Sequence, residues 1–107
     1  MAEHDAMMAR FVHDYLELLD HRVSSIRSHI EQRNFMTAHV ALLSLESTSV
    51  MVGADGLASA AGRLREAVEQ GDREVVPALL DAVGDQADRT RDELGGTAAE
   101  PGQGQPV

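Results

Sequence analysis

The apolar residues of this chain recur at steps of three and four, and this spacing predicts amphipathic helices without strands. The first helix is expected over residues 5–33, with a short separate helical turn around Met7 and Met8 as a variant. Three further helices are expected at residues 35–52, 55–70 and 73–94.

The expected helix boundaries coincide with residues that start or end helices. No glycine or proline precedes Gly53, so the first two helices lack the strongest helix breakers. Asn34, Asp55 and Asp72 are expected to cap the helices that follow them, because their side-chain oxygens can accept a bond from a free backbone N–H. Gly53 and Gly71 are expected to end helices by adopting a left-handed backbone.

Each helix carries one apolar stripe, and the four stripes must bury against one another. Because the turns between the helices are short, neighbouring helices must run antiparallel, which predicts an all-α, up-down-up-down four-helix bundle. The residues expected in its core are Phe11, Tyr15, Leu18, Leu19, Val23, Ile26 and Ile30; Phe35, Ala38, Leu42, Leu45, Ser49 and Val52; Leu57, Ala60, Ala61, Leu64, Ala67 and Val68; and Val76, Leu79, Leu80, Val83, Ala87 and Leu94.

The chain is expected to consist of one folded domain, residues 1–94, followed by a tail. Its 107 residues, 43% of them hydrophobic, are enough for one modest core. Residues 95–107 are rich in glycine and proline and have no apolar periodicity. Such a segment cannot bury enough apolar surface to fold, so a disordered C-terminal tail is expected.

The charge of the chain excludes several classes of partner. The net charge is −9, so phosphate backbones and anionic lipids repel the surface, and neither nucleic-acid nor membrane binding is expected. No apolar run approaches the roughly 20 residues that span a bilayer. The N-terminus lacks the apolar core of a signal peptide. These features predict a soluble cytoplasmic protein.

The side chains give little support for catalysis or metal binding. The chain has no cysteine, and its five histidines form no Glu-x-x-His or His-x-x-x-His pair. His21 and His29 are eight positions apart on one helix, too far for a single ion. Neither a nucleophile–histidine context nor a glycine-rich phosphate loop occurs. We therefore expect neither an enzyme nor a metal or cofactor.

Three short motifs occur with a joint spacing that resembles the histidine-phosphotransfer (HPt) domain of bacterial phosphorelays. Residues 34–35 (Asn-Phe) match the start of that family's second helix, residues 53–57 (Gly-Ala-Asp-Gly-Leu) match its Gly-Ala-x-x-Leu motif, and residues 71–72 (Gly-Asp) match its last turn. The resemblance covers about residues 10–94. It implies a four-helix bundle that docks receiver domains through its second helix.

The resemblance places the family's phospho-accepting histidine at Leu43. Counting nine residues on from Asn34 and ten back from Gly53 both reach this position. The family's lysine and glycine correspond to Glu46 and Ser47. Leucine offers no lone pair to a phosphoryl group, and Glu46 would repel one. The resemblance therefore implies an HPt-like bundle that cannot use the usual phosphorylation site.

His39 is the one alternative acceptor on this helix. It lies one turn before Leu43 and therefore on nearly the same face. No lysine or arginine accompanies it in helix register, because the adjacent turns hold Met36, Leu43 and Glu46.

The outward side of the second helix carries an apolar ridge, defined here as Met36, Val40, Leu43, Ser47 and Val50. Contiguous exposed apolar surface marks an interaction site, so this apolar ridge, with Glu46 beside it, is the expected partner-binding face. In an alternative arrangement, Met7, Met8 and Val12 of the N-terminal segment cover part of it.

Together these features predict a signalling module of two-component systems. It would bind a receiver domain, a histidine kinase or another regulator through the apolar ridge without carrying phosphate. Two alternatives remain open: an active phosphotransfer protein that uses His39, and a helical bundle that forms a homodimer through the same ridge.

Overall fold

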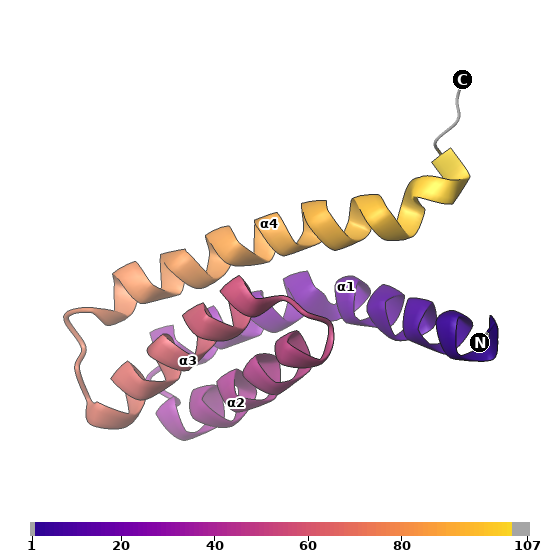
Figure 1. Cartoon of the computed structure of the whole chain (residues 1–107). Helices are drawn as coiled ribbons and strands as arrows, with labels where there is room; N and C mark the ends of the chain where they lie inside the picture. Colours follow the sequence, from indigo (N-terminus) through magenta and orange to yellow (C-terminus); the bar gives the residue numbers. More distant parts are fainter. Residues whose placement is uncertain (1, 104–107) are drawn as a thin grey trace.

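Four α-helices make up the described part of the chain. The computed structural model describes the backbone of residues 2–103 and the side chains of residues 6–95. The helices are α1 (Ala2–Glu31), α2 (Phe35–Met51), α3 (Asp55–Gln70) and α4 (Val76–Gln103) (Figure 1). No strand occurs among these residues, so the all-α prediction is confirmed.

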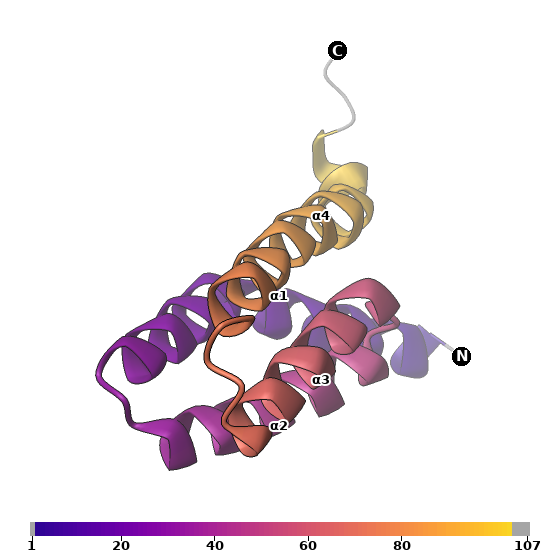
Figure 2. The ribbon, with the colours of Figure 1, turned by 90° about the vertical axis from the view of Figure 1, so that its left-hand side faces the viewer.

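The four helices form a ring, in which each packs against the next and α1 closes the ring against α4. Within the described part of the chain, the diagonal pairs α1–α3 and α2–α4 do not approach each other closely. Successive helices run in opposite directions (Figure 1, Figure 2). This is the up-down-up-down four-helix bundle that the short turns predicted.

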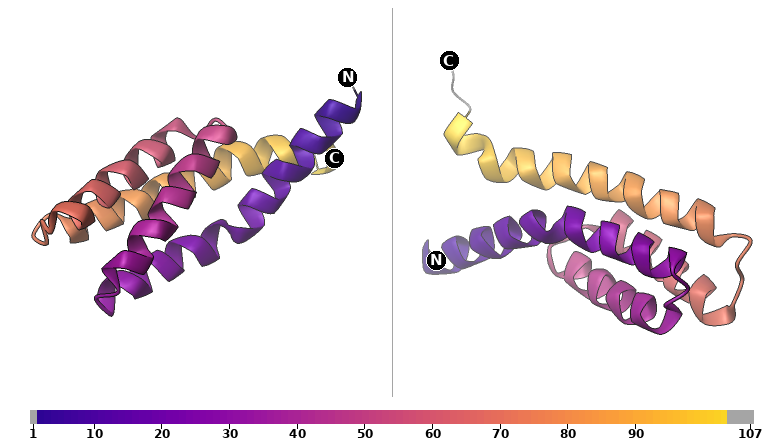
Figure 3. Two further views of the ribbon diagram at one scale, coloured as in Figure 1. Left: turned by 90° about the horizontal axis from the view of Figure 1, so that it is seen from below. Right: turned by 180° about the vertical axis from the view of Figure 1, so that it is seen from behind.

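The helices of the ring differ in length. α1 and α4 have 30 and 28 residues, whereas α2 and α3 have 17 and 16. The start of α1 and the end of α4 therefore extend beyond the α2–α3 hairpin at one end of the bundle, where they diverge (Figure 3). Met7 and Met8 belong to the continuous α1, so the variant with a separate first turn is wrong.

The predicted stripes meet inside the ring as an aliphatic core. The fully buried apolar side chains include Leu19, Ile26, Leu42, Leu45, Leu57, Leu64 and Val83. Burying a side chain of this size contributes about 1.5–3 kcal/mol. Leu18 was assigned to the core incorrectly: it is 47% exposed, because the adjacent Leu19 takes the inward position. Thr90 is also buried, although the apolar pattern did not predict it as a core residue because it is polar.

All three turns between helices close in the same way. Each contains one residue with a left-handed backbone, namely Arg33 (φ 63°), Gly53 (φ 80°) and Gly71 (φ 71°). The next residue donates its N–H to the carbonyl five positions back, in the bonds Asn34 to His29 (2.8 Å), Ala54 to Ser49 (2.8 Å) and Asp72 to Ala67 (2.9 Å). This is the Schellman closure of a helix C-terminus. The left-handed conformation expected of the two glycines is confirmed.

The predicted side-chain caps are not formed. Asn34 stands at the N-cap of α2, but its side chain makes no capping hydrogen bond. The N-cap of α3 is Ala54, and Asp55 is already the first helical residue. α4 begins only at Val76, so Asp72 cannot cap it. The backbone bond that closes each turn already sets the direction of the next helix, which leaves the polar side chains in solvent.

α4 continues past its predicted end. It reaches Gln103, so the helix end expected at Leu94 is wrong, and residues 95–103 of the expected disordered tail are helical. Residues 104–107 lie outside the described residues. The Gly-Gly pair at 95–96 has no positive φ that would end the helix, and the Thr-Ala-Ala-Glu run after it contains strong helix formers.

A buried hydrogen bond joins α1 to α2 within the core. The hydroxyls of Tyr15 and Ser49 lie 2.7 Å apart, and both side chains are buried. Each hydroxyl satisfies the other, which avoids the cost of an unpaired buried polar group. Burial raises the pKa of Tyr15 above its ordinary value of 10.0, while the hydrogen bond with Ser49 and the charge of Arg22 partly oppose this shift.

We expect Arg33→Gly to stabilise the fold by about 0.5–1 kcal/mol, because it removes the strain of a side chain in a left-handed backbone. The matched control is Gly71→Arg, which places arginine in nearly the same conformation. Gly71 has open space around it, so only this conformational cost should appear, as a destabilisation. Chemical denaturation followed by circular dichroism measures both variants, and an unchanged or lowered stability of Arg33→Gly would contradict the prediction.

We expect the stability advantage of the wild type over Tyr15→Phe, about 1 kcal/mol near neutral pH, to shrink above about pH 10. The folded state favours the neutral phenol, so its contribution is present below the unfolded pKa and is lost as pH rises through the raised folded pKa. The chain has one tyrosine, no lysine and no cysteine, so no other side chain titrates in this range. Denaturation midpoints of both proteins across this range measure the effect; a constant difference would contradict it.

Candidate functional site on the outward face of helix α2

Helix α2 turns one side into the core. Ala38, Leu42, Leu45 and Ser49 are each fully buried, and they recur at helical spacing along one side. The opposite side of a helix then faces outward. The burial of this side of α2 determines which of its side chains a partner can reach.

The apolar ridge occupies the outward side. Met36, Val40, Leu43 and Val50 expose 86%, 65%, 47% and 59% of their surface, and Ser47 between them is also exposed. The five side chains therefore share an outward face, as their spacing predicted.

The N-terminal part of α1 leaves the ridge uncovered. Met7 and Met8 are themselves 71% and 45% exposed, and this part of α1 extends past the end of the α2–α3 hairpin (Figure 3). The alternative in which Met7, Met8 and Val12 bury the ridge is therefore wrong. The reason is the length of α1, which is one continuous helix that runs past the hairpin instead of folding back over α2 (Figure 3).

Two further apolar side chains on the surface, Met51 and Leu18, were not expected there from the sequence. Met51 is 61% exposed and lies one turn after Ser47. Leu18 is exposed on α1 one turn before Arg22, whose guanidinium donates to Ser44 Oγ of α2 at 3.3 Å. The spacing of Tyr15, Leu19 and Ile26 could have identified Leu18 as outward, because those three residues already define the inward side of α1.

A charged network borders the ridge on the side of α3. Arg65 Nε donates to Glu46 Oε1 at 2.8 Å, and Arg65 Nη1 lies 3.7 Å from Glu69 Oε1. Gly62 makes room for the Glu46 carboxylate, because an added Cβ would lie 3.0 Å from its Oε2. The hydrogen bond that Arg65 donates to the Glu46 carboxylate raises the pKa of Arg65 above its ordinary value. Glu46 thus lies at the edge of the ridge with its charge neutralised.

His39 belongs to the same border. Its Nε2 lies 3.7 Å from Glu69 Oε2, is itself buried, and has no hydrogen-bond partner among the described residues. A phosphoryl donor has no direct access to this nitrogen, and the Glu69 carboxylate would repel a phosphoryl group. The geometry of His39 therefore disfavours a role as phosphate acceptor.

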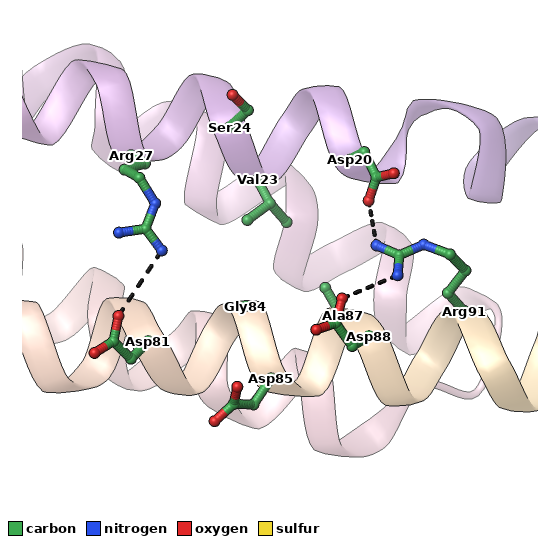
Figure 4. A pocket seen from close by; sticks show the side chains of 10 residues that line it. All are labelled: Asp20, Val23, Ser24, Arg27, Asp81, Gly84, Asp85, Ala87, Asp88 and Arg91. Atoms are coloured by element: carbon green, nitrogen blue, oxygen red, sulfur yellow. Dashed lines mark hydrogen bonds and ion pairs between the residues drawn. The ribbon is translucent and has the colours of Figure 1, made fainter.

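A groove of about 620 Å³ lies between α1 and α4, apart from the ridge (Figure 4). Arg91 bonds to Asp20 across the groove and to Asp88 on its own helix at 2.9 Å, and Arg27 lies 3.9 Å from Asp81. Both arginines of the groove are thus paired with aspartates, and the pairs hold α1 against α4. Sequence reasoning missed this groove, although three aspartates recur along one side of α4 at positions 81, 85 and 88.

The chemistry that the α2 face offers is apolar contact beside an ion-paired border. Within residues 6–95, no group of three or more histidine, aspartate or glutamate side chains is placed to hold a metal ion. None of the helices in the described part of the chain is long and apolar enough to cross a membrane. No family model, no curated protein and no solved structure matches this chain.

Proposed function

We propose that this chain is a non-catalytic binding module of two-component signalling, which docks a receiver domain or a histidine kinase through the apolar ridge of α2. The observation that carries the proposal is the exposure of four large apolar side chains along one helix. Leu43, at the position that the HPt resemblance assigns to the phospho-histidine, lies at the centre of this ridge.

The exposure of the ridge supports a binding role. Apolar surface in contact with water is unfavourable, so a contiguous stripe of it on a stable bundle favours a partner that covers it. Aliphatic side chains at the centre of an interface contribute most when water is excluded around them. The ion-paired Glu46–Arg65 border is suited to the polar rim of such an interface.

The chemistry of the ridge supports docking without phosphotransfer. Leu43 is half-exposed, so a histidine at this position would be accessible to a donor, but leucine has no nucleophilic atom. Glu46 replaces the lysine of the family pattern, and Arg65, the cation beside it, already donates to its carboxylate. Within residues 6–95, the guanidinium nearest this position is therefore not free to bind a phosphoryl group. The positions that form the bundle are retained, while those that handle phosphate are changed.

We expect Leu43→Asp and Val40→Asp each to weaken docking at least about tenfold, because each places a charge in the centre of an apolar interface. The measurement is the Kd of each variant for individual purified receiver domains and kinase dimerisation domains. The matched control is Val75→Asp, which changes an exposed apolar residue of the α3–α4 turn that is not part of the ridge. Equal affinities of the ridge variants and the control, all with unchanged helicity, would contradict the proposal.

We expect the wild type to take up no acid-labile phosphate from a phosphorylated receiver domain, and Leu43→His to acquire this ability. The reason is that the variant restores an accessible imidazole at the centre of the docking surface. The control is Val75→His, which places an exposed histidine outside the ridge and should take up no phosphate. Uptake by the wild type that is lost in His39→Ala would instead establish phosphotransfer through His39. Failure of Leu43→His to label while it still binds the receiver would contradict docking of the HPt type.

A further inference from the structure

The ridge has the spacing of a coiled-coil seam. Its steps along α2 are 4, 3, 4 and 3 residues, which is the alternation that keeps one stripe facing a partner helix. The spacing is also nearly symmetric about Leu43. When two such helices run antiparallel with their Leu43 side chains together, Met36 of one copy stands opposite Val50 of the other, and Val40 stands opposite Ser47. The ridge is thus complementary to itself.

The distribution of charge favours the α2 face over the other helices as the surface that a second copy approaches. α4 carries six carboxylates against two arginines, and four aspartates line the groove between α1 and α4. α2 carries a single carboxylate, Glu46, which Arg65 neutralises. α4 lies diagonally across the ring from α2, so pairing through α2 keeps the most acidic surfaces of two copies far apart.

We propose that two copies of this chain form a symmetric homodimer through the apolar ridge, with antiparallel α2 helices and a two-fold axis at Leu43. Such an interface is isologous, because the same patch serves both copies. Ser47 is the small member of the seam, and it lets the facing helix approach closely at the position opposite Val40. The exposed Met36 and Val50, at the two ends of the ridge, cover each other across the axis.

The dimer regulates access to the docking surface, a consequence that rests on the proposed function. A ridge covered by a second copy cannot also contact a receiver domain or kinase. Partner binding then requires dissociation of the dimer, so the apparent affinity for the partner falls as the concentration of this chain rises.

Disulfide trapping tests the geometry directly, because the natural chain contains no cysteine. We expect Leu43→Cys to oxidise to a disulfide-linked dimer, since the two-fold axis brings the two thiols together. A mixture of Met36→Cys and Val50→Cys chains should give mainly the mixed disulfide. Val75→Cys, exposed outside the ridge, is the control and should remain largely monomeric under the same oxidant.

Solution mass provides an independent measurement. In sedimentation equilibrium, the wild type should shift from monomer to dimer as concentration rises, and Leu43→Asp should stay monomeric with unchanged helicity. A monomeric wild type at every soluble concentration, or equal oxidation of Leu43→Cys and Val75→Cys, overturns the dimer. Neither measurement involves a partner, so a monomeric wild type that binds receiver domains would leave the proposed function standing. A dimeric wild type that binds no receiver domain or kinase would support the dimer and contradict the proposed function.

Discussion

Helix α2 can bury only one of its sides, and the rest of the molecule depends on which one it buries. Ala38, Leu42, Leu45 and Ser49 are committed to the core, where Ser49 also shares a hydrogen bond with Tyr15 of α1. A rotation of α2 that brought the opposite side inward would bury the Met36–Val50 stripe at the cost of this packing and would leave the Tyr15 hydroxyl unpaired. The packing of one face therefore creates the exposed surface on the other.

Charge is distributed unevenly around the ring of helices. α1 and α4 meet across a groove where arginines bridge aspartates, so this seam is held by ion pairs beside the core contacts (Figure 4). Exposed ion pairs of this kind contribute little individually, so the aliphatic core remains the main source of stability. The α2 face has the opposite character, with apolar side chains and one carboxylate that is already paired. The bundle thus has one acidic side and one nearly neutral, apolar side.

Because of this asymmetry, the proposed docking and the proposed self-association use the same surface. A partner or a second copy that covers the ridge removes apolar area from water without bringing the acidic groove close to other charges. Leu43 lies at the centre of both proposed interfaces. The same position explains why phosphate chemistry is not expected there: its side chain contributes contact area and has no lone pair. The geometry of His39 disfavours it as a substitute acceptor, because its Nε2 is buried beside Glu69.

The sequence by itself determined the number of helices, the bundle topology and nearly all of the core, because helical periodicity and short turns are local properties. It also identified the ridge, since residues at steps of three and four on one helix must share a face. Only the tertiary structure decided that the ridge is uncovered, because that depends on where the N-terminal part of α1 runs beyond the hairpin (Figure 3). It likewise decided the pairing of Glu46 with Arg65 and the exposure of Leu18. These features depend on contacts between helices, and periodicity along one helix carries no information about the side chains of another.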